Sequence, residues 1–95
     1  MHEGHRQRLM DRYLREGLHT FEDHQFLELM LFYAIPRKDT NAVAHRLLKA
    51  FGSITNIFEA DIRALMQVEG IGKNAAVFLK MVFEAAKRYR LDSKK

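Results

Sequence analysis

The chain has 95 residues, of which 47% are hydrophobic and 29% charged, as in a small globular domain. This composition excludes a disordered tail or a collagen-like rod, and the length predicts one domain, residues 1–95, with a single core. The absence of cysteine excludes disulfides and thiolate chemistry. Because no apolar run could span a membrane and no leader opens the chain, we expect a cytoplasmic protein. A net charge of +4 weakly favours a polyanionic partner.

Helical periodicity runs along the whole chain, and no segment alternates apolar and polar residues for long, as a strand does. A first helix is predicted over residues 4–16 and ended by Gly17. A second is predicted over residues 22–34, with Thr20 and Asp23 resembling a capping box. This second helix is apolar on nearly all sides, so we expect it at the centre of a small bundle.

Pro36 ends the second helix, and the remaining chain predicts three short helices and a long one. Each short helix follows a capping side chain, namely Asp39 or Thr40, then Ser53, then Asp61. Gly52 ends the first of the three. The long helix runs to about Arg90, with residues 91–95 frayed, and its predicted inner stripe is Ala75, Phe78, Val82, Ala85 and Tyr89. The aromatic residues fall on inner stripes and are interpreted as core, so the predicted fold is an all-α bundle of five to six short helices.

The most informative segment is Val68-Glu69-Gly70-Ile71-Gly72-Lys73-Asn74-Ala75-Ala76, between a short helix and the long one. Glycines permit positive φ and close approach of another chain, and Ile71 is expected to anchor the turn in the core. The amides of the two glycines and of the first helical turn lack intrahelical partners, so with the helix dipole they form an anion site. Lys73 adds a mobile positive charge. The alternative is a plain turn between two helices with a glycine cap.

The whole string resembles the helix-hairpin-helix motif of DNA repair and replication proteins. The resemblance implies that the amides of Gly70, Gly72 and Ala75 bind one DNA phosphate, with Ile71, Lys73 and Asn74 in the same turn. In some relatives a monovalent cation bridges turn carbonyls and the phosphate, and the matching carbonyls are those of Met66, Val68 and Ile71. Some DNA glycosylases with this motif use a lysine nucleophile where this chain has Asn74, which cannot form a Schiff base. We therefore expect no catalysis.

Three further segments, residues 2–9, 23–41 and 44–48, resemble the N-terminal region of the bacterial RadC family, as does the 68–76 turn. The most specific string is Ala34-Ile35-Pro36-Arg37-Lys38-Asp39-Thr40-Asn41. This resemblance implies tandem helix-hairpin-helix units related by approximate two-fold symmetry, in a protein associated with DNA repair. Family members continue into a metalloprotease-like domain with a His-x-His pattern, which is absent from this sequence. We therefore expect a domain fragment or a truncated relative.

Two clusters of cations are further candidates for DNA contact. Arg8, Arg12 and Arg15 share one face of the first helix, as a stripe for phosphates or as a solvated outer face. Arg37 and Lys38, with Thr40, lie where a second, degenerate hairpin would meet the opposite strand. A simple connector is the alternative, although two cations at the positive end of a helix oppose its dipole.

Five histidines are present, but no two stand at i, i+4 on one helix, so no metal site is expected. No other cofactor is expected. The predicted function is sequence-independent DNA binding through backbone phosphates. The alternative is a protein-interaction module that docks to a repair or replication partner, or to a C-terminal metalloprotease-like domain.

Overall fold

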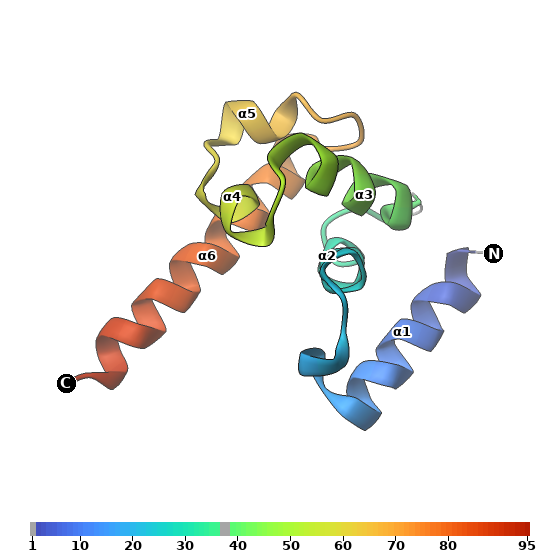
Figure 1. The fold of residues 1–95 in the computed structure, drawn as a ribbon, viewed down its shortest axis with the longest axis horizontal. Coiled ribbons are helices and arrows are strands. Elements are labelled where there is room, and N and C mark those ends of the chain that lie inside the picture. Colours follow the sequence, from blue (N-terminus) through green and yellow to red (C-terminus); the bar gives the residue numbers. More distant parts are fainter. Residues whose placement is uncertain (1, 37–38) are drawn as a thin grey trace.

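The computed structural model describes residues 2–36 and 39–95, and these residues form helices and turns without any strand. The helices are α1 (His2–Glu16), the 3-10 helix η1 (Leu18–Thr20), α2 (Asp23–Leu31), α3 (Thr40–Phe51), α4 (Ile54–Glu59), α5 (Ile62–Met66) and α6 (Lys73–Ser93) (Figure 1). The all-α fold is therefore confirmed. None of the described helices has both the length and the apolar composition that crossing a membrane requires.

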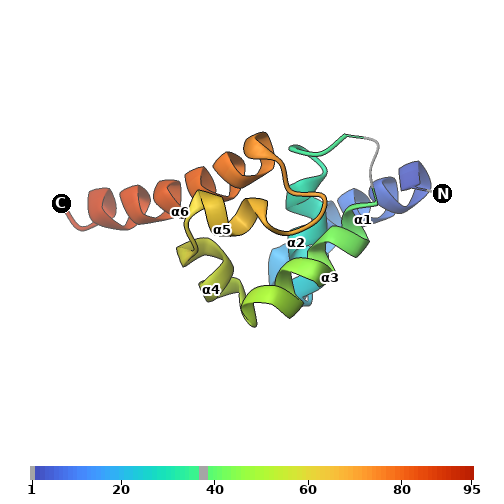
Figure 2. The same ribbon diagram turned by 90° about the horizontal axis from the view of Figure 1, so that it is seen from above.

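The core lies between the central helix α2 and the helices that follow it. Leu27 and Leu31 of α2 are fully buried, as expected from the apolar sequence of this helix. They belong to one cluster with Val43, Ala44 and Leu47 of α3, Ile57, Leu65, Val68 and Ile71, and Ala75, Ala76 and Leu79 of α6. A smaller cluster of Leu9, Leu29 and Phe32 attaches α1 to the other side of α2. Figure 2 shows α1 and the C-terminal end of α6 at opposite ends of the molecule.

The short helices begin and end where the sequence predicts. The side chains of Asp39, Ser53 and Asp61 each accept a hydrogen bond from the amide three residues later. Gly17 and Gly52 adopt φ angles of 82° and 91° after α1 and α3, a region that suits glycine. These capping side chains and terminal glycines act within one helical turn, so tertiary packing does not change their effect.

The cap of α2 was predicted wrongly. The capping box consists of Glu22 and Gln25, whose side-chain oxygen accepts a hydrogen bond from the Glu22 amide at 3.1 Å. Thr20 instead belongs to η1, and its hydroxyl donates to Glu16 Oε1 at 3.2 Å. Because Thr20 bonds back to α1, the next polar pair along the chain caps α2.

The end of α2 also differs from the prediction, because the helix stops at Leu31 and not at Ala34. The amides of Tyr33 and Ala34 donate to the carbonyls three residues before them, so the last turn tightens before Pro36. A guanidinium stabilises this turn, since Arg6 donates to the carbonyls of Phe32 and Ile35 at 3.3 and 2.9 Å. The end of α2 is thus tied to α1.

The second half of α6 leaves the bundle. Its helix continues to Ser93, three residues beyond the predicted end at Arg90. The predicted inner stripe is wrong beyond Val82, because Ala85 is exposed and Tyr89 is 72% exposed. Phe83 is the last large apolar residue of α6 held by the bundle, where its ring stacks on Phe58 of α4. The C-terminal half of α6 extends past α4, and no other described helix lies beside it to cover the rest of the predicted stripe (Figure 1).

Glu28 is the buried carboxylate that joins the first three helices. The residue is 2% exposed, and its Oε1 accepts a hydrogen bond from Asn41 Nδ2 of α3 at 3.1 Å. Its Oε2 lies 2.6 Å from His5 Nε2 of α1. A buried carboxylate is costly unless it is partnered, so this contact set specifies how α1, α2 and α3 pack together.

We expect Glu28→Ala to lower the free energy of unfolding by about 1–3 kcal/mol, because the half-buried Asn41 amide loses its acceptor. Glu28→Gln keeps an acceptor and should cost less. Glu84→Ala is the matched control, since Glu84 is exposed and should stay within about 0.5 kcal/mol of the native value. Urea denaturation measures all three. Equal stability of Glu28→Ala and Glu84→Ala would contradict this role of Glu28.

Candidate nucleic-acid interface

The connection between α5 and α6 is a tight turn built around one glycine. The amide of Ile71 donates to the Val68 carbonyl at 3.0 Å, and Gly70 has a φ of 97°. A hydrogen-bonded turn with glycine at positive φ in its third position fits a type II turn, since the type I′ alternative would also require positive φ at the non-glycine residue Glu69. A Cβ at Gly70 would lie 2.7 Å from Val43 Cγ2 of α3, so both backbone and packing require glycine here.

Gly72 differs from the expectation that both glycines adopt positive φ. Its φ of −91° and ψ of −172° are extended, and other residues adopt them readily. A Cβ at Gly72 would meet no atom within 4 Å. The missing side chain at Gly72 therefore leaves open space in front of α6.

The first turn of α6 presents unpaired amides to that open space. Gly72 precedes the helix without a side-chain cap, and its carbonyl accepts the amide of Ala76 at 3.0 Å. Within the described chain no acceptor is found for the amides of Lys73, Asn74 and Ala75. The side chain of Ile71 is buried, as predicted, and that of Ala75 is buried too, so these two residues can contribute only backbone atoms.

These amides line an open cleft of about 410 Å³, here called the amide cleft. Its walls are Ala34, Ile35 and Pro36 on one side and Gly70, Gly72, Lys73, Asn74 and Ala75 on the other. The structure thus brings the connection after α2 beside the glycine turn (Figure 2). No acidic residue is among these lining residues. Free amides, the positive end of the α6 dipole and the Lys73 ammonium together suit a small anion.

The second predicted hairpin is only partly visible. Arg37 and Lys38 lie outside the described residues. Thr40 was predicted to contact DNA, but its side chain is only 3% exposed in the first turn of α3. Thr40 faces the bundle because Asp39 takes the exposed capping position and accepts the Ala42 amide at 3.2 Å. Thr40 is therefore too buried to make the DNA contact that the sequence predicts.

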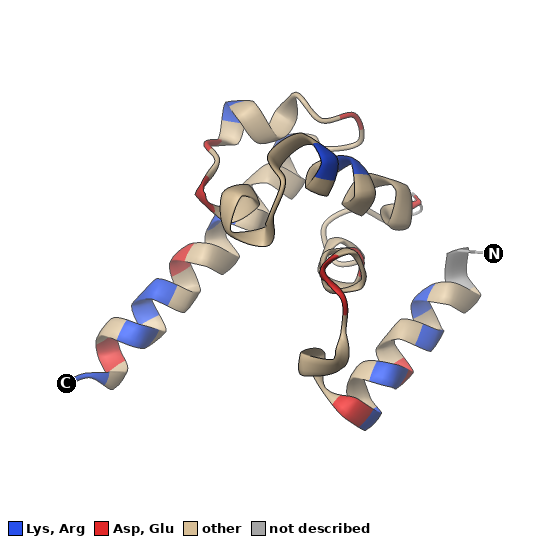
Figure 3. Cartoon of the chain, in the orientation of Figure 1, with Lys and Arg blue, Asp and Glu red and all other residues tan. Residues whose placement is uncertain are grey.

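The predicted arginine stripe on α1 is also corrected at Arg12. Arg12 donates to the Thr20 carbonyl at 2.6 Å and to Gln25 Oε1 at 3.1 Å, and its guanidinium lies over the Phe21 ring. These contacts hold the α1–α2 connection, so Arg12 is a structural residue. Arg8 and Arg15 remain exposed on the same helix. Figure 3 shows several basic positions along α1.

Of the carbonyls implied for a monovalent cation, that of Val68 already accepts the Ile71 amide. The other two carbonyls implied for the cation are those of Met66 and Ile71. Cation binding by this turn stays a prediction.

Arg46 is a neighbour of the turn that the sequence did not indicate. Its Nη1 donates to the Glu69 carbonyl at 3.2 Å, across 23 residues of sequence. It lies one helical turn after Val43, which packs on Gly70. No sequence pattern links positions so far apart, although the i, i+3 spacing of Val43 and Arg46 is a signal once α3 is known to face the turn.

The histidines do not form a metal-sized cluster among the described residues. His5 contacts Glu28, and the rings of His24 and His45 stack with centroids 4.6 Å apart. These contacts pack α1, α2 and α3 against each other.

The family model for the UPF0758 N-terminal region matches residues 2–77, which end within the first half of α6. The chain belongs to this family. It is 42% identical over 82 residues to a UPF0758 protein of Fusobacterium nucleatum, covering 86% of this chain and 35% of that protein. It is 36% identical over 84 residues to a UPF0758 protein of Ruegeria pomeroyi, covering 88% of this chain and 38% of that protein.

The chain thus spans little more than a third of the length of these UPF0758 relatives. No solved structure matches it. The matched region contains the complete turn and the first helical turn of α6, so the amide cleft lies within the UPF0758 N-terminal region.

The two glycines of the turn should respond differently to the same substitution. Gly70→Ala should lower the free energy of unfolding by about 2–3 kcal/mol, because a Cβ at positive φ is strained and meets Val43. Gly72→Ala should cost only about 0.5–1 kcal/mol, the loss of a glycine N-cap, since its backbone is extended and its surroundings are open. Thermal and urea denaturation measure both. Equal losses at the two positions would contradict the geometry of the turn.

Proposed function

We propose that this domain binds DNA through the phosphate backbone, without reading the base sequence. The observation that carries the proposal is the amide cleft at the uncapped N-terminus of α6. Of its described lining residues, only Lys73 and Asn74 have hydrogen-bonding side chains, so the backbone amides are the main donors. Amides aimed at one point fit a phosphate, whereas reading bases requires side chains that reach the edges of bases in a groove.

The resemblance of the turn to helix-hairpin-helix motifs supports the same proposal, as does the resemblance of the chain to the RadC family. It adds a context of DNA repair in the bacterial cytoplasm and a role in binding rather than catalysis. We further propose that the turn after α2 is a degenerate second hairpin. Its described residues 34–36 form the other wall of the amide cleft.

Binding through so small a cleft should be weak and sensitive to salt. We expect contact with about two to four phosphates, which gives a log–log slope of affinity against salt of about −2 to −4. Two duplexes of unrelated sequence should differ by less than about 1–3 kcal/mol, the cost of one mismatched base pair for a specific binder. Fluorescence anisotropy over a salt series measures both quantities. A strong preference for one sequence would overturn the backbone mechanism.

Gly72→Val should reduce DNA affinity about tenfold or more, because its side chain would occupy the open space over the amides, whose charge-assisted bonds are among the stronger ones. Gly4→Val is the matched control, since Gly4 is exposed on α1 and does not line the amide cleft. Circular dichroism checks that both variants are folded. Native affinity of folded Gly72→Val would exclude the amide cleft as the phosphate site.

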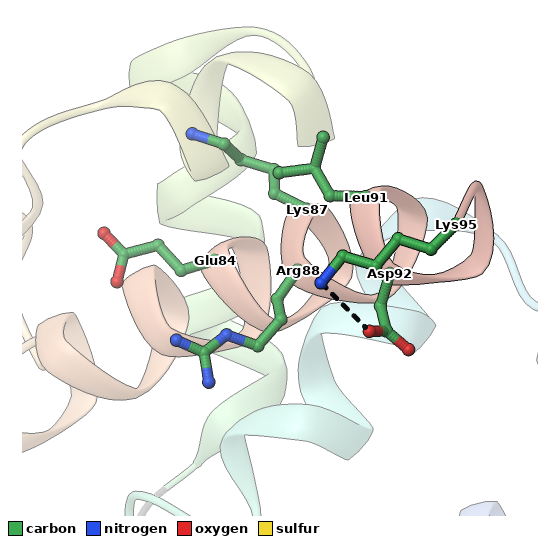
Figure 4. A pocket seen from close by; sticks show the side chains of 6 residues that line it. All are labelled: Glu84, Lys87, Arg88, Leu91, Asp92 and Lys95. Carbon is green, nitrogen blue, oxygen red and sulfur yellow. Dashed lines mark ion pairs between the residues drawn. The ribbon is translucent and has the colours of Figure 1, made fainter.

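A second candidate function, a protein-interaction module, is favoured by the free half of α6. Tyr89 and Leu91 are 72% and 69% exposed on it. Figure 4 shows Leu91 among charged side chains of this half, where the contact between Lys95 and Asp92 is the marked ion pair. Large apolar side chains exposed together on one element are typical of docking surfaces. Almost two thirds of each UPF0758 relative lies outside the match, and we propose that part of the protein as the docking partner.

Salt and substitutions separate the two candidate functions. Docking through Tyr89 and Leu91 should persist at high salt, whereas phosphate binding should be lost. The test mixes this chain with the remaining part of the Fusobacterium relative in a calorimeter. For docking, Tyr89→Ser with Leu91→Ser should abolish association and leave DNA affinity unchanged. For DNA binding alone, no association should occur.

A further inference from the structure

The glycine turn has a different cleft on each side. One is the amide cleft, and the other, here called the arginine cleft, has a volume of about 290 Å³. The arginine cleft is lined by Asp39, Ala42, Val43, Arg46, Glu69 and Gly70. Gly70 lines both clefts, whereas Glu69 lines only the arginine cleft, so the peptide that joins Glu69 to Gly70, here called the central peptide, borders both.

This central peptide has a fixed direction. Its carbonyl, that of Glu69, accepts a hydrogen bond from Arg46 in the arginine cleft. In a planar trans peptide the N–H points opposite to the C=O. The N–H of Gly70 is therefore directed away from Arg46 and out of the arginine cleft.

The central peptide is also the part of the turn that can reverse. Type I and type II turns differ mainly by rotating this peptide through about half a turn, which exchanges the directions of its C=O and N–H. Glycine at positive φ favours the type II form, but glycine also permits the other. An external donor on the Glu69 carbonyl stabilises only the orientation seen here.

We propose that Arg46 is a positioning residue for anion binding: its hydrogen bond to Glu69 locks the turn with the Gly70 amide facing the amide cleft. The inference rests on the proposed DNA-binding function. Arg46 acts through the turn and does not touch the phosphate. This agrees with its surroundings, because Asp39 and Glu69 line the arginine cleft and disfavour an anion there.

The binding experiment compares native protein, Arg46→Ala and Arg46→Lys with the same duplex over a salt series. Arg46→Ala should bind about five- to tenfold more weakly, because one charge-assisted amide bond to the phosphate is misdirected. Its salt slope should stay at the native value, since no phosphate contact is removed. Arg46→Lys should restore part of the affinity by donating to the same carbonyl. Lys49→Ala, which removes one exposed charge from the same helix, should have a smaller effect than Arg46→Ala.

A measurement without DNA tests the turn itself. The native type II turn places the Hα of Glu69 close to the amide proton of Gly70, which gives a strong nuclear Overhauser effect between them. Arg46→Ala should weaken this effect and shift the Gly70 amide resonance, and Arg46→Lys should restore both. Circular dichroism and urea denaturation establish that the variants are folded.

The following outcomes would overturn the proposal about Arg46 or the DNA-binding function on which it rests. A salt slope reduced in magnitude by about 0.9 in Arg46→Ala would make Arg46 a direct phosphate contact. Unchanged affinity, or an unchanged Gly70 signal, would remove Arg46 from the control of the turn. If the native protein binds no DNA at any salt concentration, the proposed function fails. The resonance experiment then still decides whether Arg46 orients the peptide.

Discussion

The candidate site depends on how closely α3 approaches the backbone at Gly70. A side chain at Gly70 would stand 2.7 Å from Val43 Cγ2, and Val43 is itself 2% exposed in the main core. α3 also packs against α2 through the same core cluster, to which Val43 itself belongs. α3 therefore sets the separation between the end of α2 and the glycine turn, which are the two walls of the amide cleft. A substitution that moved α3 would change the cleft without touching any residue that lines it.

The positive charges of the chain divide between structure and surface. Arg6 and Arg12 have their guanidinium groups on carbonyls and aromatic rings of the α1–α2 region. Arg46 donates to the turn, and Lys80 donates to the Phe58 carbonyl at 2.9 Å. Arginine suits the positions of Arg6 and Arg12, because its planar guanidinium can donate to carbonyls and lie on an aromatic ring at the same time. A count of basic residues therefore overstates the charge that is available to a polyanion.

The sequence predicts the local features of this fold well and its long-range features poorly. The caps at Ser53 and Asp61 and the stop at Gly52 were correct because each is a contact within one helical turn. The positive φ expected at Gly70 was correct, because the motif that predicts it spans only a few residues.

The errors arise where the tertiary structure decides. Thr20 bonds back to α1, and Arg12 is drawn into the connection that follows its helix. Tyr89 continues the apolar period of α6, but α6 extends past the helices that could cover it. The contact of Arg46 with the glycine turn could not be predicted, because Arg46 and Glu69 are 23 residues apart in the sequence.

Net charge pointed toward a polyanion, yet most of that charge lies far from the amide cleft. Residues 84–95 hold five of the 16 Lys and Arg and two of the 12 Asp and Glu, so three of the four net charges lie there. With a rise of about 1.5 Å per residue, Lys87 lies about 21 Å from Lys73 along α6, more than two Debye lengths at physiological salt. Charge at that distance adds little to anion binding at the other end of the helix. Within the described chain, an anion in the amide cleft would therefore be attracted by the uncapped amides, the helix dipole and Lys73 rather than by the charge at the far end of α6.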